Sequence, residues 1–294
     1  MRCPLTVLIP CKNEESNIAA CIASAREIAD EILVADSLST DRTLEIVQHL
    51  GGCRIIQREY IDYGNFNNWA IPQATHPWVL LIDADERLTD PLRREIARLL
   101  ASPPCHDGYW IYRDNYFMGR RIRFSGWQRN RVLRLFRRDL GRFNDAGDHS
   151  RLVIATGNVG RLHHRLLHFT YTSYDQYFRK FHRYTKLQAQ RWFAEGRQVG
   201  WFDLALAGPA RFLRAYILQL GFLDGLAGLQ VCMLTGFYSF AKRARLWELW
   251  AQHEAARLQG DESQGDPPGP AVGLATSGSN FSVPQARAPL RRAS

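Results

Sequence analysis

Three carboxylates stand together at the end of a short apolar segment. The segment Val79–Ile82 is followed closely by Asp83, Asp85 and Glu86. A short apolar run is typical of a strand buried on both faces of a parallel sheet, and ligands bind at the carboxyl ends of such strands. Asp83 and Asp85 could together approach a divalent cation such as Mg²⁺, which takes carboxylate oxygens and substrate phosphates. The spacing indicates a metal–diphosphate site; the alternative is a solvated turn before the helix that Thr89–Pro91 opens.

The surrounding segments must place these acids at the edge of a sheet. Apolar runs typical of strands alternate with segments of helical periodicity over the first hundred residues. This alternation predicts a parallel α/β sheet. The expected strands cover residues 5–10, 31–36, 53–57 and 79–82, and the expected helices cover residues 18–28, 42–50, 64–74 and 91–100.

A second expected strand also ends in an acid, Asp36. On its own, Asp36 is more typical of a turn or a helix cap than of a binding site. No G-x-G-x-x-G follows the first strand, and no G-x-x-x-x-G-K-[ST] occurs anywhere in the chain. The sequence therefore disfavours dinucleotide-binding and P-loop sites.

The chain has 294 residues, a net charge of +9 and a pI near 9.5, which fits one or two domains and an anionic partner. The candidate anionic partners are nucleic acid, nucleotide, phospholipid and phosphorylated glycan. The six cysteines are scattered and include no C-x-x-C, so reduced thiols are expected. The apolar run at residues 5–10 is too short for a secretion signal, and none is expected.

Residues 113–142 hold ten arginines against two aspartates, with no lysine or glutamate. Arginine favours planar, bidentate contacts to phosphate or carboxylate, and the aromatic residues between the arginines suit sugar rings. One hypothesis is a site for a phosphorylated or acidic glycan acceptor or a membrane headgroup, with Trp127, Arg131 and Arg134 as candidate acceptor ligands. The alternatives are single-stranded nucleic acid and a solvated face of a partly buried strand.

Three histidines lie in residues 159–169, a segment with the pattern of a strand. Strand alternation places His164 and His168 on one face and His163 on the other. Because a metal site needs several ligands that converge, a histidine metal site is disfavoured.

The last third of the chain reads as helical. A helix rich in aromatic and basic residues is expected over residues 174–195, and residues 215–241 carry a single charge, Asp224. That length could span a bilayer, but a central acid is costly there, and basic residues at both ends give no orientation. We favour two amphipathic helices lying in an anionic leaflet; a buried helix pair is the alternative. The tail, residues 256–294, is mostly rich in Gly, Pro, Ser and Ala and is expected to be disordered.

Several ordered motifs resemble the family 2 glycosyltransferases of GT-A fold, and most closely the subgroup of lipopolysaccharide core β-1,4-glucosyltransferases. The resemblance covers roughly residues 4–250. It implies a catalytic domain at residues 1–170, with a nucleotide-sugar half (1–104) and an acceptor half (105–170), then a membrane-associated helical region (171–255). The motifs are VLIPCKNEESNIAACIAS, EILVADSLSTDRT, YGNFNNWAI, WVLLIDADERL, DGYWIYRDNYFMGRRIR, GWQRNRVLRLFRR and FLRAYILQLGFLDGLAGL.

The resemblance also implies roles for single residues in donor binding. Asp36 would accept a hydrogen bond from uracil, and Asp85, with Asp83 beside it, would bind Mg²⁺ or Mn²⁺. The family usually has Lys-Asn where this chain has Asn67-Asn68, a difference that bears on diphosphate affinity. The complete set of implied nucleotide-sugar ligands is Pro10, Lys12, Asn13, Glu14, Asp36, Asn68, Asp83 and Ala84.

Direct transfer with inversion needs a base that takes the acceptor proton. The family places a His-Glu pair after Arg-Phe; here His149 matches the histidine, but Ser150 stands at the glutamate position. Asp148 is the predicted base, and Asp145 and His149 are further catalytic candidates. A structural role for His149 is an equal alternative.

The sequence as a whole predicts a metal-dependent, inverting glycosyltransferase at the cytoplasmic face of a bacterial inner membrane, held there peripherally. The donor would be a UDP-hexose, and the acceptor a lipid-linked glycan such as lipopolysaccharide core. A polyprenyl-linked glycan or a peptide is the alternative acceptor. From other classes, a nucleotide-sugar-binding protein without catalysis stays open, whereas nucleic acid is not an expected partner because exposed carboxylates repel its phosphates.

Overall fold

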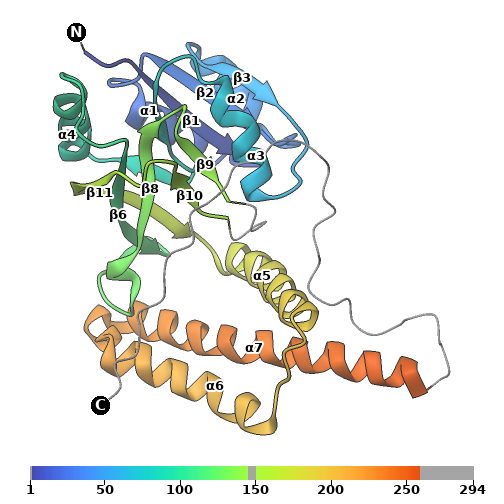
Figure 1. The fold of residues 1–294 in the computed structure, drawn as a ribbon. Helices are drawn as coiled ribbons and strands as arrows, with labels where there is room; N and C mark the ends of the chain where they lie inside the picture. The colour runs from blue at the N-terminus through green and yellow to red at the C-terminus, as the bar shows by residue number, and fades with distance from the viewer. Residues whose placement is uncertain (1, 145–149, 259–294) are drawn as a thin grey trace, which may run out of the picture.

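The computed structural model describes residues 2–144 and 150–258, and a nine-stranded sheet forms its centre (Figure 1). The strand order is β3-β2-β1-β4-β8-β6-β11-β5, and β7, which lies off this path, pairs with β6. A separate two-stranded sheet joins β9 and β10. The strands are β1 Leu5–Cys11, β2 Glu31–Asp36, β3 Arg54–Gln57, β4 Trp78–Leu81, β5 Glu86–Leu88, β6 Gly108–Phe117, β7 Arg120–Ile122, β8 Arg131–Arg137, β9 Gly141–Phe143, β10 Leu152–Ile154 and β11 Val159–Tyr171.

The two halves of the sheet differ in strand direction. β3, β2, β1 and β4 are all parallel, as the alternation of strands and helices predicts. β8 then pairs antiparallel with both β4 and β6, and β6 pairs parallel with β11. The predicted α/β class is therefore confirmed, with a mixed rather than wholly parallel sheet. The antiparallel pairs β4–β8 and β5–β11 join strands that are far apart in the chain, so the local sequence pattern does not show which strands meet.

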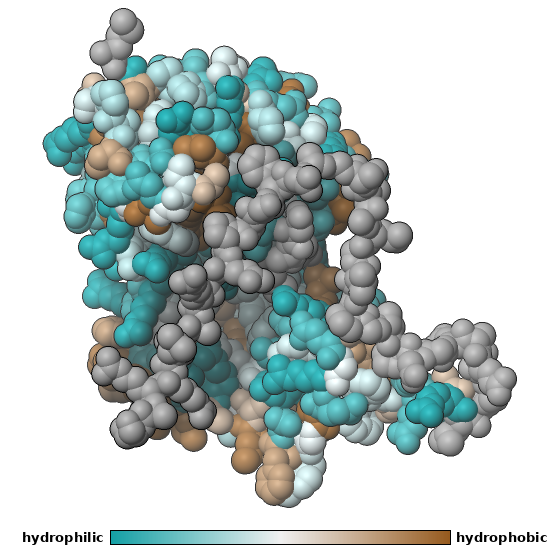
Figure 2. Space-filling model, in the orientation of Figure 1, coloured by the Kyte–Doolittle hydropathy of each residue, from teal (hydrophilic) through white to brown (hydrophobic). Residues whose placement is uncertain are grey.

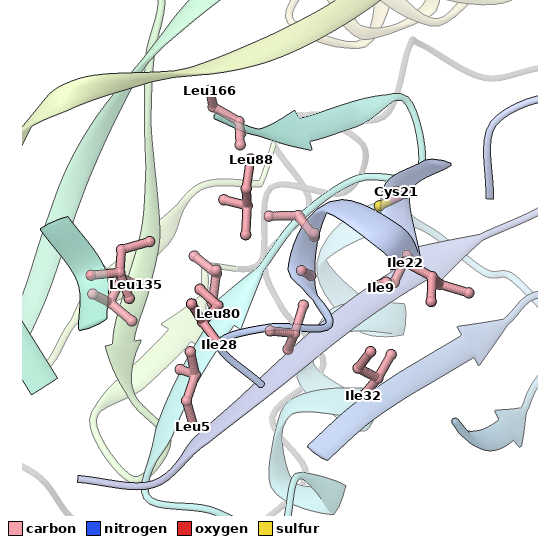
Figure 3. Packing of buried hydrophobic residues seen from close by; sticks show 14 of the residues in the cluster. Leu5, Ile9, Cys21, Ile22, Ile28, Ile32, Leu80, Leu88, Leu135 and Leu166 are labelled. Carbon is pink, nitrogen blue, oxygen red and sulfur yellow. The ribbon is translucent and has the colours of Figure 1, made fainter. Parts of the chain in front are cut away.

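Helices cover both faces of the parallel half. On one face, α1 (Ile18–Ala25), α2 (Thr43–Leu50) and α4 (Asp90–Leu100) pack on a core that includes Leu5, Ile9 and Leu80 (Figure 3). On the other face, α3 (Tyr63–Ala70) and the β9–β10 pair enclose a second core. All four residues of β4 are buried and alternate between these cores, which explains why this strand is entirely apolar.

Two local differences from the predicted elements have simple causes. The helix expected over residues 64–74 ends at Ala70, and a 3₁₀ turn, Ile71–Gln73, follows because Pro72 has no amide hydrogen to continue the α-helix. The sequence does not predict the three-residue strand β5, which begins at Glu86, the last of the three carboxylates. It pairs antiparallel with β11, a partner about 80 residues further along the chain, so no local pattern marks it.

The helical third packs beneath the sheet (Figure 1) and begins with α5 (Tyr174–Ala194), close to its predicted bounds. α6 (Trp201–Leu213) continues into a π-helical turn, Arg214–Leu218, and a 3₁₀ turn, Gly221–Asp224, leads into α7 (Gly225–Leu258). The residues Phe117, Ile122 and Val231 form a small core that joins β6 and β7 to α7. α7 ends at Leu258, three residues into the predicted tail, which begins at residue 256. Residues 259–294 lie outside the described part of the chain.

The surface of α6 and α7 is unusually apolar. Of the described large apolar residues that are exposed, most lie between Trp201 and Trp247, including Leu218 at 77% and Leu226 at 73% exposure. Figure 2 shows brown, apolar residues along the lower edge of the molecule, where these helices lie in Figure 1. No described helix is by itself long and apolar enough to cross a membrane; Trp201–Leu218 and Gly221–Arg257 meet the length and composition needed only as a pair bent by 74°.

Candidate functional site

A cavity of about 570 Å³ opens at the carboxyl ends of β1 and β4, where parallel α/β sheets bind ligands. α3 and α5 form its other walls. The acids that follow β4 therefore meet groups from a helix nearly 100 residues further along the chain. The lining residues are Pro10, Cys11, Lys12, Glu14, Ser37, Tyr60, Tyr63, Phe66, Asn67, Asp83, Ala84, Asp85, His168, Thr170, Tyr171, Lys180, Arg183 and Tyr184.

Asp85 is the most enclosed acid facing this cavity, with 8% of its surface exposed. Its Oδ2 lies 3.6 Å from Nε2 of His168 and 3.7 Å from Nζ of Lys180. Burial alone raises the pKa of Asp85, but the hydrogen bond and charge of His168, with the charges of Lys180 and Arg113, outweigh it and hold that pKa well below its ordinary value. Oδ1 of Asp85 is buried without a hydrogen-bond partner among the described residues. An ionised carboxylate with one unpartnered oxygen is suited to a cation.

The orientation of His168 is fixed from behind by β6. Nδ1 of His168 lies 2.7 Å from Oδ1 of Asn115, and Nδ2 of Asn115 donates to the carbonyl of Trp127. That second bond sets which end of the Asn115 amide accepts, so Nδ1 of His168 carries the proton. Nε2 of His168 is directed toward Asp85, 3.6 Å from its Oδ2, and this nitrogen would become the metal ligand if a cation replaced that contact.

Asp83 belongs to a different group, a buried cluster of two acids and two arginines. Arg113 and Arg134 each pair with both Asp83 and Glu86, and Glu86 has no exposed side-chain surface. Tyr63 donates to Oδ1 of Asp83 at 3.2 Å. The equal number of opposite charges lets the cluster stay ionised in the interior. Asp83 lines the cavity, but its Oδ2 already accepts from two guanidinium groups.

The residues present fit a divalent cation at Asp85. Among residues 2–144 and 150–258, no three histidine, cysteine or acidic side chains converge as a complete metal site. Asp85 and His168 would supply two protein ligands, and a diphosphate and water the others, which is the way Mg²⁺ is commonly held. Because Asp83 pairs with two arginines, the structure favours Asp85 over Asp83 as the metal ligand of the two predicted aspartates.

The loop after β1 divides its predicted nucleotide ligands between two tasks. Pro10, Lys12 and Glu14 line the cavity. Asn13, with a positive φ of 53°, instead accepts a hydrogen bond from the Thr40 amide and so ties this loop to the one after β2. Burial raises the pKa of Glu14, a hydrogen bond from Asn17 opposes this, and repulsion by Asp85 adds to the rise. The structure thus brings three of these four residues to the site.

Asp36 and Asn68 are placed differently from their predicted roles. Asp36 is fully buried at the end of β2, and its carboxylate accepts from Ser39 and from Nε2 of Gln57; its neighbour Ser37 lines the cavity. Asn68 exchanges two hydrogen bonds with the backbone of Phe143, joining α3 to β9.

On α3, Asn67 rather than Asn68 faces the cavity, and its Oδ1 has no hydrogen-bond partner in the described residues. Ala84 also lines the cavity, as predicted.

The predicted acceptor residues do not gather in one place. Arg134 is buried at 4% exposure within the acid–arginine cluster, so its assignment as an acceptor ligand is corrected to a structural partner of Asp83 and Glu86. Trp127 packs beside the small core that joins β6 to α7, and Arg131 is exposed with its guanidinium 4.9 Å from the ring centre of Trp110. The predicted catalytic residues Asp145, Asp148 and His149 lie outside the described residues.

Three site residues escaped the sequence reasoning: His168, Lys180 and Arg183. His168 was weighed only with His163 and His164, but both of those backbone amides bind Glu95 on α4, away from the cavity. The alternation of side chains along β11 could have identified His168, because a single histidine that points inward can add to a site whose acids come from another strand. Lys180 and Arg183, three apart on α5, share a helix face, and nothing local shows that this face meets the sheet.

Comparisons with known proteins agree with this geometry. The sequence model of Glycosyl transferase family 2 matches residues 6–155. The lipopolysaccharide core biosynthesis glycosyltransferase LpsC of Rhizobium meliloti is 31% identical over 250 residues, which cover 83% of this chain and 92% of that protein. An uncharacterized glycosyltransferase of Rickettsia typhi is 29% identical over 260 residues, 83% of this chain and 87% of that one.

Among solved structures, glucosyl-3-phosphoglycerate synthase from Mycobacterium tuberculosis, with Mn²⁺, UDP and glucosyl-3-phosphoglycerate, matches with a TM-score of 0.33. The match covers 39% of this chain and 44% of that one, at 23% identity. The family match covers the strands from β1 to β10, the acids after β4 and most of the residues that line the cavity, and it ends before β11. The chain has the GT-A fold and belongs to glycosyltransferase family 2.

Proposed function

We propose that this glycosyltransferase moves a hexose from a UDP-linked donor to a lipid-linked glycan such as lipopolysaccharide core, with inversion at the anomeric carbon. The observation that carries the donor assignment is Asp85, an ionised, enclosed carboxylate that lines the cavity and has one oxygen without a hydrogen-bond partner among the described residues. A bound Mg²⁺ or Mn²⁺ would act there as a Lewis acid that neutralises charge on the departing nucleoside diphosphate.

Side chains of α5 supply further positive charge for the diphosphate. Lys180 reaches the cavity beside Asp85, and Arg183 lies over the Tyr60 ring, 5.3 Å from its centre. The family commonly places a lysine on the equivalent of α3, where this chain has Asn67. We therefore assign to Lys180 and Arg183 the role of holding the donor phosphates, which preorganised cations stabilise as charge develops.

The acceptor proposal has two supports. The relative LpsC is named for lipopolysaccharide core biosynthesis. α6 and α7 expose many large apolar residues, and grouped exposed apolar residues mark membrane or protein contact. Helices with such a face lie in the membrane interface and are held by apolar burial and anionic lipid. On this proposal the protein is peripheral, at the cytoplasmic face of the bacterial inner membrane.

Inversion requires a base near the acceptor hydroxyl. Asp148 keeps that role as a prediction from the sequence. Ser150, the first described residue after it in the sequence, packs against Gly64 on α3, the helix that forms one wall of the cavity. Asp148→Asn should abolish transfer and leave UDP binding intact, whereas Asp145→Asn should retain transfer.

The donor proposal is tested by calorimetric titration of UDP into the full chain with Mn²⁺ and then with EDTA. Asp85→Asn should lose the metal-dependent part of the affinity, and Asp139→Asn, which removes an exposed acid in the turn before β9, should match the wild type. The same samples should hydrolyse UDP-glucose slowly only with metal. UDP affinity that is equal in EDTA and in Asp85→Asn would overturn the assignment.

A second candidate function is nucleotide-sugar binding without catalysis, and Ser150 at the usual glutamate position favours it. Metal-dependent UDP binding without any hydrolysis, and without transfer to lipopolysaccharide core, polyprenyl-linked glycan or peptide, would select this alternative. Transfer to one of the latter two would instead replace the acceptor in our proposal.

A further inference from the structure

A second cavity, of about 670 Å³, lies between the turn after β6 and the start of α7. Three arginines from the β7 segment line it, Arg120, Arg121 and Arg123, together with apolar residues that include Leu223 and Leu226. Figure 1 shows this turn meeting one end of the α6–α7 pair, and Figure 2 shows apolar residues at the surface along that edge. The donor cavity shares none of these lining residues.

The charge in this second cavity is poorly neutralised. Arg121 pairs with Asp114 at 2.8 Å, but within the described chain neither Arg120 nor Arg123 has an ion-pair partner. Asp224 is the single acid in the lining, and its carboxylate accepts from the backbone amides of Arg123 and Phe124. Because Asp224 is engaged by the backbone, the guanidinium groups are left to face an external anion. Arginine binds phosphate through paired N–H donors.

The apolar side of the cavity identifies the kind of phosphate. Leu223 is 55% exposed and Leu226 73% exposed, and both belong to the cavity wall. Leu218, just before this turn, is 77% exposed. A free phosphate or a nucleotide gains nothing from leucines at the rim. A lipid satisfies both halves, because its headgroup can pair with the arginines while its acyl chains lie against the leucines.

We propose that this cavity binds the phosphate headgroup of an anionic membrane phospholipid. The inference rests on the membrane association proposed above and gives it a defined contact. The exposed face of α6 and α7 would supply apolar burial without lipid selectivity. The arginine cavity would supply the preference for anionic lipid and fix which way the catalytic domain faces the bilayer.

The test measures binding of the full chain to vesicles of phosphatidylcholine alone and of phosphatidylcholine with phosphatidylglycerol. The double variant Arg120→Gln/Arg123→Gln should bind phosphatidylglycerol vesicles about tenfold to thirtyfold more weakly than wild type, since a basic residue at the surface contributes roughly a factor of five. The matched control is Arg94→Gln/Arg98→Gln, which removes the same charge from the exposed side of α4 and should stay within about twofold of wild type. Equal losses in the two double variants would overturn the proposal.

A second measurement separates lipid from free phosphate. Titration with a short-chain phosphatidylglycerol, below its micelle concentration, should show saturable binding that the Arg120→Gln/Arg123→Gln variant lacks. Equal affinity for glycerol 3-phosphate would overturn the lipid assignment. UDP binding with Mn²⁺ is measured on the same samples. If wild type binds UDP but no vesicle, the membrane proposal and this lipid site are both wrong, and the donor site stands. If wild type binds vesicles but not UDP, the donor site alone is wrong.

Discussion

Replacing Arg134 by methionine tests whether this arginine is a structural partner or an acceptor ligand. Its side chain is 5% exposed, and the paired Glu86 side chain is not exposed at all. Arg134→Met keeps an unbranched side chain but removes the guanidinium group and leaves Glu86 and Asp83 to share Arg113. Breaking a buried ion pair by removing one partner costs about 3–5 kcal/mol. For a domain of this size, that corresponds to a fall in Tm of roughly 6–20 °C.

Arg131 offers a matched control three residues earlier on the same strand. It is exposed and contacts the Trp110 ring, so Arg131→Met should cost about 0.5–1 kcal/mol. The assay is thermal unfolding of the full chain followed by circular dichroism. The double variant Glu86→Gln/Arg134→Met should recover part of the lost Tm. In Arg134→Met two acids face one arginine, and Glu86→Gln removes the negative charge that is left without a partner. A Tm for Arg134→Met within about 2 °C of Arg131→Met, combined with a raised acceptor KM, would refute the structural role and restore the acceptor one.

Three further predictions concern stability. Burial raises the pKa of Glu31, but hydrogen bonds from Thr6, Thr75 and Arg54 outweigh it and hold that pKa at about 2, below the ordinary 4.5. The stability that Glu31 contributes is therefore full above pH 4.5 and is lost as the pH falls toward 2. The Tm difference between wild type and Glu31→Gln should shrink over that window, and a constant difference would contradict this. The raised pKa of Glu14 has the opposite sign: its ionisation favours unfolding, so Glu14→Gln should have the higher Tm at pH 7.5, with the gain vanishing below the ordinary glutamate pKa. Gly228→Ala should lower Tm by several degrees, because a Cβ there collides with the Gly221 carbonyl, while Gly200→Ala, which meets only the side chain of its own cap at 3.8 Å, should change it little.

Local pattern was sufficient to predict the parallel half of the fold and the sheet edge at which Asp83 and Asp85 lie, where we propose the donor site. β4 is apolar because both of its faces are buried, and β1 and β2 show nearly the same burial. The position of Asp85 at the carboxyl end of β4 follows from that pattern alone. The mixed half was less accessible, since β5 and β11 meet only through long-range pairing.

Assigning roles among neighbouring residues was the weaker step, because it depends on side-chain direction. Asn67 and Asn68 are adjacent on α3, yet one faces the cavity and the other binds the backbone of Phe143. Arg131 and Arg134 belong to one arginine-rich segment, yet one is at the surface and the other in the core. Composition favours phosphate or carboxylate partners for all such arginines, and the carboxylates that Arg134 finds are internal, Asp83 and Glu86. Only tertiary contacts distinguish an internal acid from an external ligand.

The two cavities are linked by a single strand, and this sets a limit on the acceptor. Arg113 of β6 pairs with Asp83 at the donor cavity, whereas Phe117, four residues further along β6, lines the arginine cavity. At about 3.3 Å per residue, the backbone positions are separated by roughly 13 Å. If lipid is held at the arginine cavity, the donor site lies close to the membrane surface, so the acceptor hydroxyl must belong to a sugar near its lipid anchor. With a series of acceptors that carry the same terminal sugar on lengthening glycans, transfer should be fastest for the shortest and fall steeply once the spacer exceeds about 15–20 Å. Because hydrolysis of UDP-glucose does not involve the acceptor, its rate should stay constant across the series. Transfer that is independent of spacer length would show that β6 does not fix the distance between lipid and donor.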